Sequence, residues 1–172
     1  ERPLNDEPAV RSTERPLNEE PAVRSTERPL NDRFYDRNIY RCIDYSRSSR
    51  SYLFVNKQVT WNEANNFCNR QGLHLVTITD NYLNMWLIQK GLEVGSYDWW
   101  IGLHDRHHEG LFEWIGKMWS DFRRWGTGEP NNHDGREDCV HLRADGSWND
   151  HTCHQQKFAF ICESKRQKCS GM

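Results

Sequence analysis

The sequence predicts an α+β domain, and three observations support this prediction. Two short helical patterns begin at Thr60 and Asp80, ahead of most of the strand-like segments. Those segments are short apolar runs concentrated in the second half of the chain. Residues 116–137 form a polar stretch rich in Gly, Pro and Asn. Helices and strands that are segregated rather than strictly alternating favour an α+β arrangement.

Both helices have recognisable start and stop signals. Thr60 and Glu63 have capping-box spacing, and Gly72 is expected to end the first helix. Asp80 is the expected N-cap of the second helix, and Gly91 is expected to end it. The apolar residues of the two helices are Trp61, Ala64, Phe67 and Cys68, then Leu83, Trp86 and Leu87.

The expected strands are apolar runs between these helices and after them. They lie at residues 52–55, 74–78, 99–103, 111–115, 140–142 and 158–162, with 99–103 and 111–115 interpreted as buried. Core packing is the expected role of Trp61, Trp100 and Trp114. A loop as long as residues 116–137 inside a compact domain is usually functional.

Residues 1–33 are a 13-residue repeat and are expected to form a disordered arm. ERPLNDEPAVRST is followed by ERPLNEEPAVRST and by the truncated ERPLNDR. Five of the six prolines lie in this segment, where they would interrupt a helix every two turns. We expect an extended, solvated spacer, with an interaction or mineral-binding arm as the alternative. The folded domain is assigned to residues 34–172.

Composition excludes several classes of partner and indicates an extracellular protein. A formal net charge of −2 over 172 residues gives no reason to expect nucleic acid or an anionic membrane surface as a partner. The chain contains no apolar run of about 18 residues, so membrane insertion is not expected. Removal or omission of a secretory signal would explain a start at Glu1 with no Met.

The cysteines predict a disulfide framework and an oxidising compartment. Six are present, at positions 42, 68, 139, 153, 162 and 169. An even number in a small domain favours disulfides over zinc, because no CxxC pair occurs. Six cysteines allow 15 pairings, so their number alone does not give the connectivity.

Oxygen-bearing side chains crowd a 22-residue window that follows Gly128. They are Glu129, Asn131, Glu137, Asn149 and Asp150. Carboxylates and side-chain amides are the hard oxygen ligands that Ca²⁺ takes, six to eight at a time. Such a site needs no Cys or His, which argues against zinc or copper. His104, His107 and His108 cluster loosely near Asp105, but no Cys completes a metal site there.

Taken in order, the landmark residues resemble the C-type lectin-like domain over about residues 42–163. They are Trp61-x-x-Ala64-x-x-x-Cys68, Trp100-Ile101-Gly102-Leu103, Phe112-x-Trp114, Glu129-Pro130-Asn131, Glu137-Asp138-Cys139, Trp148-Asn149-Asp150, Cys153 and Cys162. Each triplet alone is a weak signal, but the ordered combination is specific. The resemblance implies the C-type lectin fold, with two helices, small antiparallel sheets and a long calcium-binding loop.

The same resemblance implies a disulfide pattern. The two family disulfides map onto Cys68–Cys162 and Cys139–Cys153. In longer family members a further cysteine lies near position 51, where this chain has Ser51. Cys42 is therefore expected to pair with Cys169, with a bond between two chains as the alternative.

The resemblance also implies calcium sites and a class of sugar. The five oxygen-bearing residues match the family's principal Ca²⁺ site, with a cis peptide bond before Pro130. Glu-Pro-Asn resembles the version that selects the equatorial hydroxyls of mannose, N-acetylglucosamine and glucose, or the equivalent pair of fucose. An auxiliary Ca²⁺ site maps onto Asp105, Glu109, Asn132 and Asp138. His133 and His151 occupy positions that contact bound sugar in mannose-binding members of the family.

The expected function is calcium-dependent binding of mannose-type glycans by a secreted, extracellular lectin. A glycosidase could use Glu129 and Glu137 as its acid and base, but this leaves Asn131, Asn149 and Asp150 without a role. The alternative is a matrix protein of the same fold that binds protein or mineral surfaces without sugar. Because one such site binds a monosaccharide weakly, useful avidity would require an oligomer.

Overall fold

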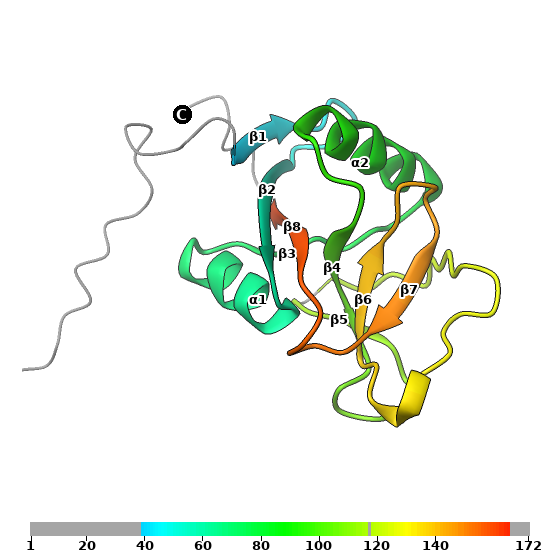
Figure 1. The fold of residues 1–172 in the computed structure, drawn as a ribbon. Coiled ribbons are helices and arrows are strands. Elements are labelled where there is room, and N and C mark those ends of the chain that lie inside the picture. Colours follow the sequence, from blue (N-terminus) through cyan, green and yellow to red (C-terminus); the bar gives the residue numbers. More distant parts are fainter. Residues whose placement is uncertain (1–38, 117, 166–172) are drawn as a thin grey trace, which may run out of the picture.

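The computed structural model describes residues 39–116 and 118–165. The predicted repeat arm at 1–33 and the start of the domain at residue 34 lie outside the described residues. The elements in chain order are β1 (Tyr40–Asp44), β2 (Ser51–Val59), α1 (Trp61–Arg70), β3 (His74–Leu75), α2 (Asn81–Val94), β4 (Trp99–His104), β5 (Glu113–Trp114), the 3₁₀ turn η1 (His133–Gly135), β6 (Cys139–Leu142), β7 (Trp148–His151) and β8 (Phe158–Ser164) (Figure 1).

The described strands form one mixed sheet, which confirms the α+β class; the small antiparallel sheets that were expected are joined into it by one parallel pair. The order along the sheet is β1-β2-β8-β4-β6-β7, with β3 added to β8 and β5 added to β4. Strands β4 and β8 run parallel, with Trp99 opposite Ala159 and Trp100 opposite Phe160. This parallel pair joins β1, β2 and β8 to β4, β6 and β7. No local pattern in the sequence predicts a pairing between strands so far apart in the chain.

Helix α1 begins and ends as predicted. The Thr60 hydroxyl accepts a hydrogen bond from the Glu63 amide at 3.3 Å. The Glu63 carboxylate accepts one from the Thr60 amide at 2.8 Å, which completes the capping box. The helix ends at Arg70, and Gly72 adopts a φ of +66° just beyond it.

Helix α2 begins as predicted but is one turn longer than expected. The Asp80 carboxylate accepts a hydrogen bond from the Leu83 amide at 2.9 Å. The prediction that Gly91 ends the helix is wrong, because the helix continues to Val94 and ends at Gly95, whose φ is +101°. Gly91 is instead a packing residue, since an added Cβ would lie 2.5 Å from the Trp99 indole nitrogen.

Two predicted strands are shorter than expected. In residues 74–78 only His74–Leu75 forms a strand, although the Val76 amide still donates to the Ile161 carbonyl at 2.9 Å. In residues 111–115 only Glu113–Trp114 does so, and the expectation of a buried strand fails for Leu111, which is 68% exposed. The Leu111 amide donates to the His108 carbonyl, so Leu111 ends a turn rather than starting a strand.

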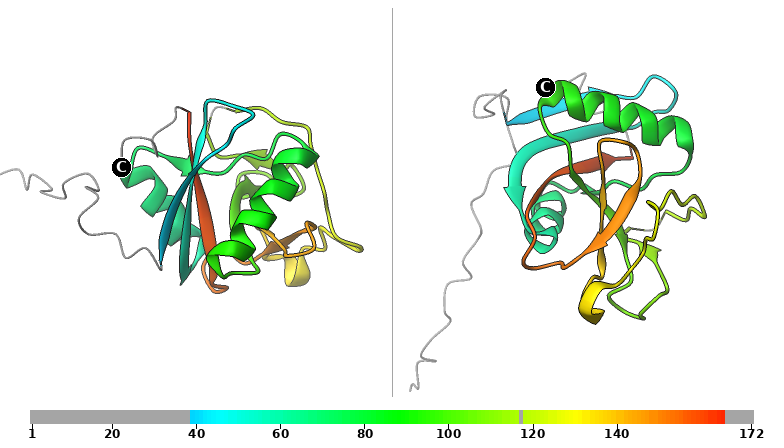
Figure 2. Two further views of the ribbon diagram at one scale, coloured as in Figure 1. Left: turned by 90° about the horizontal axis from the view of Figure 1, so that it is seen from above. Right: turned by 45° about the vertical axis from the view of Figure 1, so that its right-hand side comes forward.

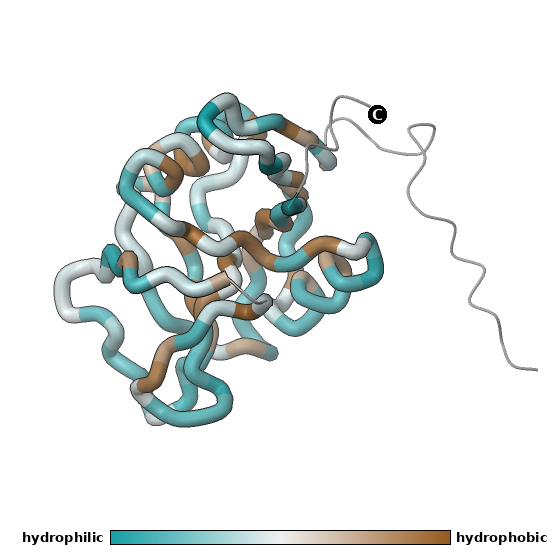
Figure 3. The backbone as a smooth tube through the Cα atoms, turned by 180° about the vertical axis from the view of Figure 1, so that it is seen from behind, coloured by the Kyte–Doolittle hydropathy of each residue, from teal (hydrophilic) through white to brown (hydrophobic). Residues whose placement is uncertain are grey.

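The two helices pack on opposite faces of the sheet. Tyr52 and Phe54 of β2 belong to the apolar cluster that includes α2, whereas Leu53 and Val55 belong to the cluster that includes α1. This alternation is the period of two that a strand buried on both faces requires. Figure 2 shows α1 and α2 on either side of β2 and β8. In Figure 3 the apolar colouring is concentrated in the central segments, and much of the long loop is hydrophilic.

Two disulfides confirm the expected pairings. Cys68–Cys162 links α1 to β8 across 94 residues of sequence. Cys139–Cys153 links the start of β6 to the residues after β7, across 14 residues of sequence. The predicted pairing of Cys42 with Cys169 involves a residue outside the described part of the chain.

Candidate functional site

The long loop is fixed to the sheet at Trp148, the residue before Asn149 and Asp150. The Trp148 amide donates to the Arg124 carbonyl at 2.7 Å, and the Trp148 carbonyl accepts from the Gly126 amide at 2.8 Å. The Trp148 ring is fully buried, and edge-on contacts surround it. Those contacts come from Trp114, Phe122 and Trp125, with ring centroids 5.6, 5.5 and 6.1 Å away. The loop and β7 are therefore held in one arrangement.

Asn84 of α2 supports this arrangement from beneath. Its side-chain oxygen accepts a hydrogen bond from the Trp148 indole nitrogen at 2.8 Å. Its side-chain nitrogen donates to the Gly146 carbonyl at 2.9 Å. Asn84 is fully buried, so both bonds are shielded from water. Sequence reasoning missed Asn84, because a single Asn on the apolar side of a helix carries no motif.

Asp150 joins β7 to the start of the predicted calcium-binding segment. The peptide bond between Glu129 and Pro130 is cis, as expected. The two carboxylate oxygens of Asp150 accept hydrogen bonds from the amides of Asn131 and Asn132, at 3.1 and 2.8 Å. The structure thus brings together residues that are 19 positions apart in sequence.

Glu137 is connected to the same segment. One of its carboxylate oxygens accepts from the His133 amide at 3.0 Å, and the other lies 3.1 Å from Nδ1 of His151. Its own amide donates to the side-chain oxygen of Asn132 at 3.1 Å. The backbone amide of His133 and the half-buried ring of His151 therefore contact the Glu137 carboxylate, whereas the His133 side chain is exposed.

Two oxygens of this group are buried without a hydrogen-bond partner among the described residues. They are Oε2 of Glu129 and Oδ1 of Asn149. Burial, and the nearby Asp150 carboxylate, raise the pKa of Glu129. Oε1 of Glu129 is paired with Arg143 at 3.2 Å, a contact that sequence reasoning also missed. Buried acceptors are almost always satisfied, so these two oxygens suit a cation that would complete their coordination.

The predicted auxiliary residues are only partly brought together. Asp105 is 2% exposed, and burial and the charges of Glu109 and Asp138 raise the pKa of its carboxyl group. Oδ2 of Asp105 accepts from the Gly110 amide at 2.8 Å, whereas Oδ1 has no partner among the described residues. Asn132 makes its side-chain contact with the Glu137 amide instead.

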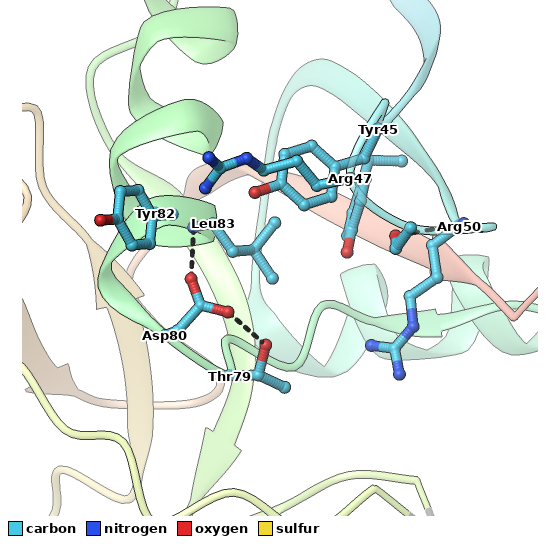
Figure 4. Close-up of a pocket in the computed structure, with 9 residues that line it drawn as sticks. Tyr45, Arg47, Arg50, Thr79, Asp80, Tyr82 and Leu83 are labelled. Atoms are coloured by element: carbon cyan, nitrogen blue, oxygen red, sulfur yellow. Dashed lines mark hydrogen bonds between the residues drawn. The ribbon is translucent and has the colours of Figure 1, made fainter.

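Two of the surface cavities in the described part of the chain lie near different elements. One, of about 610 Å³, is lined by His108, Gly110, Leu111, Phe112, Glu113, Arg123, Trp125 and Pro130. The other, of about 250 Å³, lies beside the N-terminus of α2, where Asp80 caps the helix (Figure 4). None of the predicted calcium ligands lines either cavity, but the first includes Pro130, which lies between Glu129 and Asn131.

Comparisons with known proteins place this geometry in a family. The family model described as "Lectin C-type domain" matches residues 57–164. C-type lectin domain family 4 member G of Mus musculus is 34% identical over 121 residues, which cover 69% of this chain. The matched region spans 40% of that relative's length.

Solved structures of carbohydrate-recognition domains have the same fold. The carbohydrate-recognition domain of human scavenger receptor C-type lectin has a TM-score of 0.65 and 30% identity, over 73% of this chain and 96% of that one. The cow C-type carbohydrate-recognition domain of CD23, solved in the presence of a GlcNAc2Man3 oligosaccharide, has a TM-score of 0.66 and 27% identity, over 74% and 95% of the two chains.

No helix in the described residues is long and apolar enough to cross a membrane. The similarities indicate a non-enzymatic carbohydrate-recognition family and no family of enzymes. This chain belongs to the C-type lectin domain family.

Proposed function

We propose that the protein binds mannose-type glycans in a calcium-dependent manner. The strongest support is that Oε2 of Glu129 and Oδ1 of Asn149 are buried without a hydrogen-bond partner among the described residues, and that the Asp150 carboxylate lies near Glu129. Without a cation these groups would repel one another or lack partners, and either condition is costly in a buried site.

The principal ion would be held by side-chain oxygens from the long loop and from β7. The ligands we propose are Glu129, Asn131, Glu137, Asn149 and Asp150. When bound, Ca²⁺ supplies positive charge and open coordination positions for two neighbouring sugar hydroxyls. Asp105, Glu109, Asn132 and Asp138 are proposed for an auxiliary ion that would steady the loop.

The chain's own residues would then determine which sugar is bound. Carboxylates accept hydrogen bonds from sugar hydroxyls, and the NH₂ groups of amides donate to them, so an ordered set of Glu and Asn distinguishes hydroxyl orientations. The Glu129-Pro130-Asn131 order favours mannose, N-acetylglucosamine and fucose over galactose. The CD23 domain, solved with a GlcNAc2Man3 oligosaccharide, supports this choice of sugar class. His133 and His151 are proposed to contact the bound sugar.

Glycan binding would extend beyond the terminal sugar into the cavity beside Pro130. Phe112 and Trp125 line that cavity and pack edge-on against each other, with ring centroids 4.7 Å apart. Aromatic faces of this kind suit the apolar faces of sugar rings. We also propose secretion, a spacer role for residues 1–33, and clustering of several domains for avidity.

A glycan array in millimolar Ca²⁺, compared with the same array in EDTA, tests this proposal. We expect mannose- or fucose-type binding that EDTA abolishes. The double variant Glu129→Gln, Asn131→Asp should shift preference toward galactose while keeping calcium dependence. Calcium-dependent galactose binding by the unmodified chain would refute the sugar assignment. Calcium uptake without binding to any glycan would instead favour the surface-binding alternative, which the comparisons do not favour.

A further inference from the structure

A group of nitrogen and oxygen donors lies at the β4–β5 pair, outside the proposed calcium ligands. His104 of β4 is directly opposite Glu113 of β5 in the strand register. His107, in the turn between the two strands, lies against Glu113 through its Nδ1 atom. One donor atom from each of the three side chains lies within 4.8 Å of the other two. The sequence alone showed only the histidines, because the strand register is what adds Glu113.

His104 is the unusual member of this group. Its side chain is only 2% exposed, yet its Nδ1 atom has no hydrogen-bond partner among the described residues. A buried ring nitrogen without a partner is costly for a folded protein. His107 and Glu113 are accessible, with side chains 64% and 51% exposed. The group therefore combines one fixed, buried donor with two donors at the surface.

We propose that His104, His107 and Glu113 bind Zn²⁺. Two imidazoles and one carboxylate form a known zinc ligand set that needs no Cys and keeps a fourth position for water or another ligand. Imidazole nitrogens prefer a borderline metal such as zinc, whereas the oxygen-only set at Glu129 suits Ca²⁺. The zinc site is therefore chemically distinct from both proposed calcium sites and does not depend on them.

Contacts with Trp61 hold His104 and the neighbouring turn in place. The His104 ring packs edge-on against Trp61, with centroids 5.4 Å apart. The guanidinium of Arg106 lies over the Trp61 ring, 4.3 Å from its centroid. Because Trp61 belongs to α1, this contact anchors the turn to that helix. Donor atoms around tetrahedral zinc are about 3.3 Å apart, so rotation of the exposed His107 and Glu113 side chains would complete the site.

Zinc binding at this position would affect the neighbouring loop. His104 immediately precedes Asp105, and Glu113 lines the same cavity as Pro130. A metal that joins both ends of residues 104–113 would hold this turn closed. Bound zinc would therefore stabilise the part of the cavity wall that contains Glu113.

The test is a calorimetric titration of the full chain, without a histidine tag, with Zn²⁺ in saturating Ca²⁺. Saturation with calcium keeps zinc away from the oxygen sites. The variants are His107→Ala and Glu113→Gln, and the matched control is His108→Ala, an exposed histidine of the same turn that is not part of the group. Because even outer-shell partners are worth about 10–100-fold in metal affinity, loss of a ligand should weaken zinc binding by about tenfold or more.

We expect one zinc ion per chain, weakened by both ligand variants and unchanged in His108→Ala. Nitrogen chemical shifts of His104 and His107, but not of His108, should move on addition of zinc. If the chain takes up no zinc, the group is an ordinary histidine–glutamate pair and the proposal fails. The proposal also fails if zinc binds equally well to His107→Ala and Glu113→Gln, or if calcium displaces it.

Discussion

Replacement of Asn84 by Ala should both destabilise the domain and weaken calcium binding, although Asn84 is not a proposed ligand. The change would leave the Trp148 indole nitrogen and the Gly146 carbonyl buried without their partners at 2.8 and 2.9 Å. Each buried group left unsatisfied costs about 1–3 kcal/mol. We therefore expect the free energy of unfolding to fall by about 2–5 kcal/mol, because some relaxation is certain around a smaller side chain.

The assay is urea unfolding in EDTA, followed by calcium titration of the folded variant. Calcium affinity should fall because Trp148 fixes the backbone that leads into Asn149 and Asp150. Asn69→Ala is the matched control, since the Asn69 side chain lies on the exposed side of α1 and donates to the Asn65 side chain at 3.2 Å. If Asn84→Ala is no more destabilising than Asn69→Ala, the support assigned to Asn84 is wrong.

Three further predictions follow from other parts of the molecule. Gly91→Ala should destabilise the domain by about 1–3 kcal/mol in thermal unfolding, because its Cβ would lie 2.5 Å from the Trp99 indole nitrogen; an unchanged melting temperature would contradict this packing role. Burial raises the pKa of Glu163 to about 7 in the folded protein. The folded state therefore holds this proton more tightly than the unfolded state, and the resulting stabilisation is lost as the pH rises through about 7. Between pH 5 and 8 the free energy of unfolding should therefore fall by up to about 3 kcal/mol in the unmodified chain, and Glu163→Gln should flatten this slope. Calcium should protect residues 116–137 from limited proteolysis; equal cleavage in Ca²⁺ and in EDTA would show that the ion does not order the loop.

Local signals in the sequence were sufficient for the helix starts, whereas the Cys68–Cys162 and Cys139–Cys153 pairings came from the family resemblance. Thr60 with Glu63, and Asp80 with Leu83, are contacts across three residues, so the residue types alone predict them. The end of α2 was mispredicted because a glycine can either end a helix or, since it has no Cβ, leave room for a neighbouring aromatic ring. Only the position of Trp99 shows that Gly91 does the second.

Contacts between distant segments limited the prediction of the site. The ordered triplets located Glu129, Asn131, Asn149 and Asp150, and the structure places the loop amides on Asp150. Neither Arg143 nor Asn84 could be found in this way, because each acts through one tertiary contact without a motif. Glu113 is a similar case, since only the pairing of β4 with β5 brings it to His104.

Calorimetric titration with methyl α-mannoside, in calcium and then in EDTA, tests the central claim most directly. Because coupling between two ligands is reciprocal, mannoside should also tighten calcium binding by the same factor that calcium tightens mannoside binding. The account predicts measurable mannoside binding only in calcium, and its loss in Asn149→Ala. Equal binding of mannoside in EDTA would contradict a sugar site built on the ion.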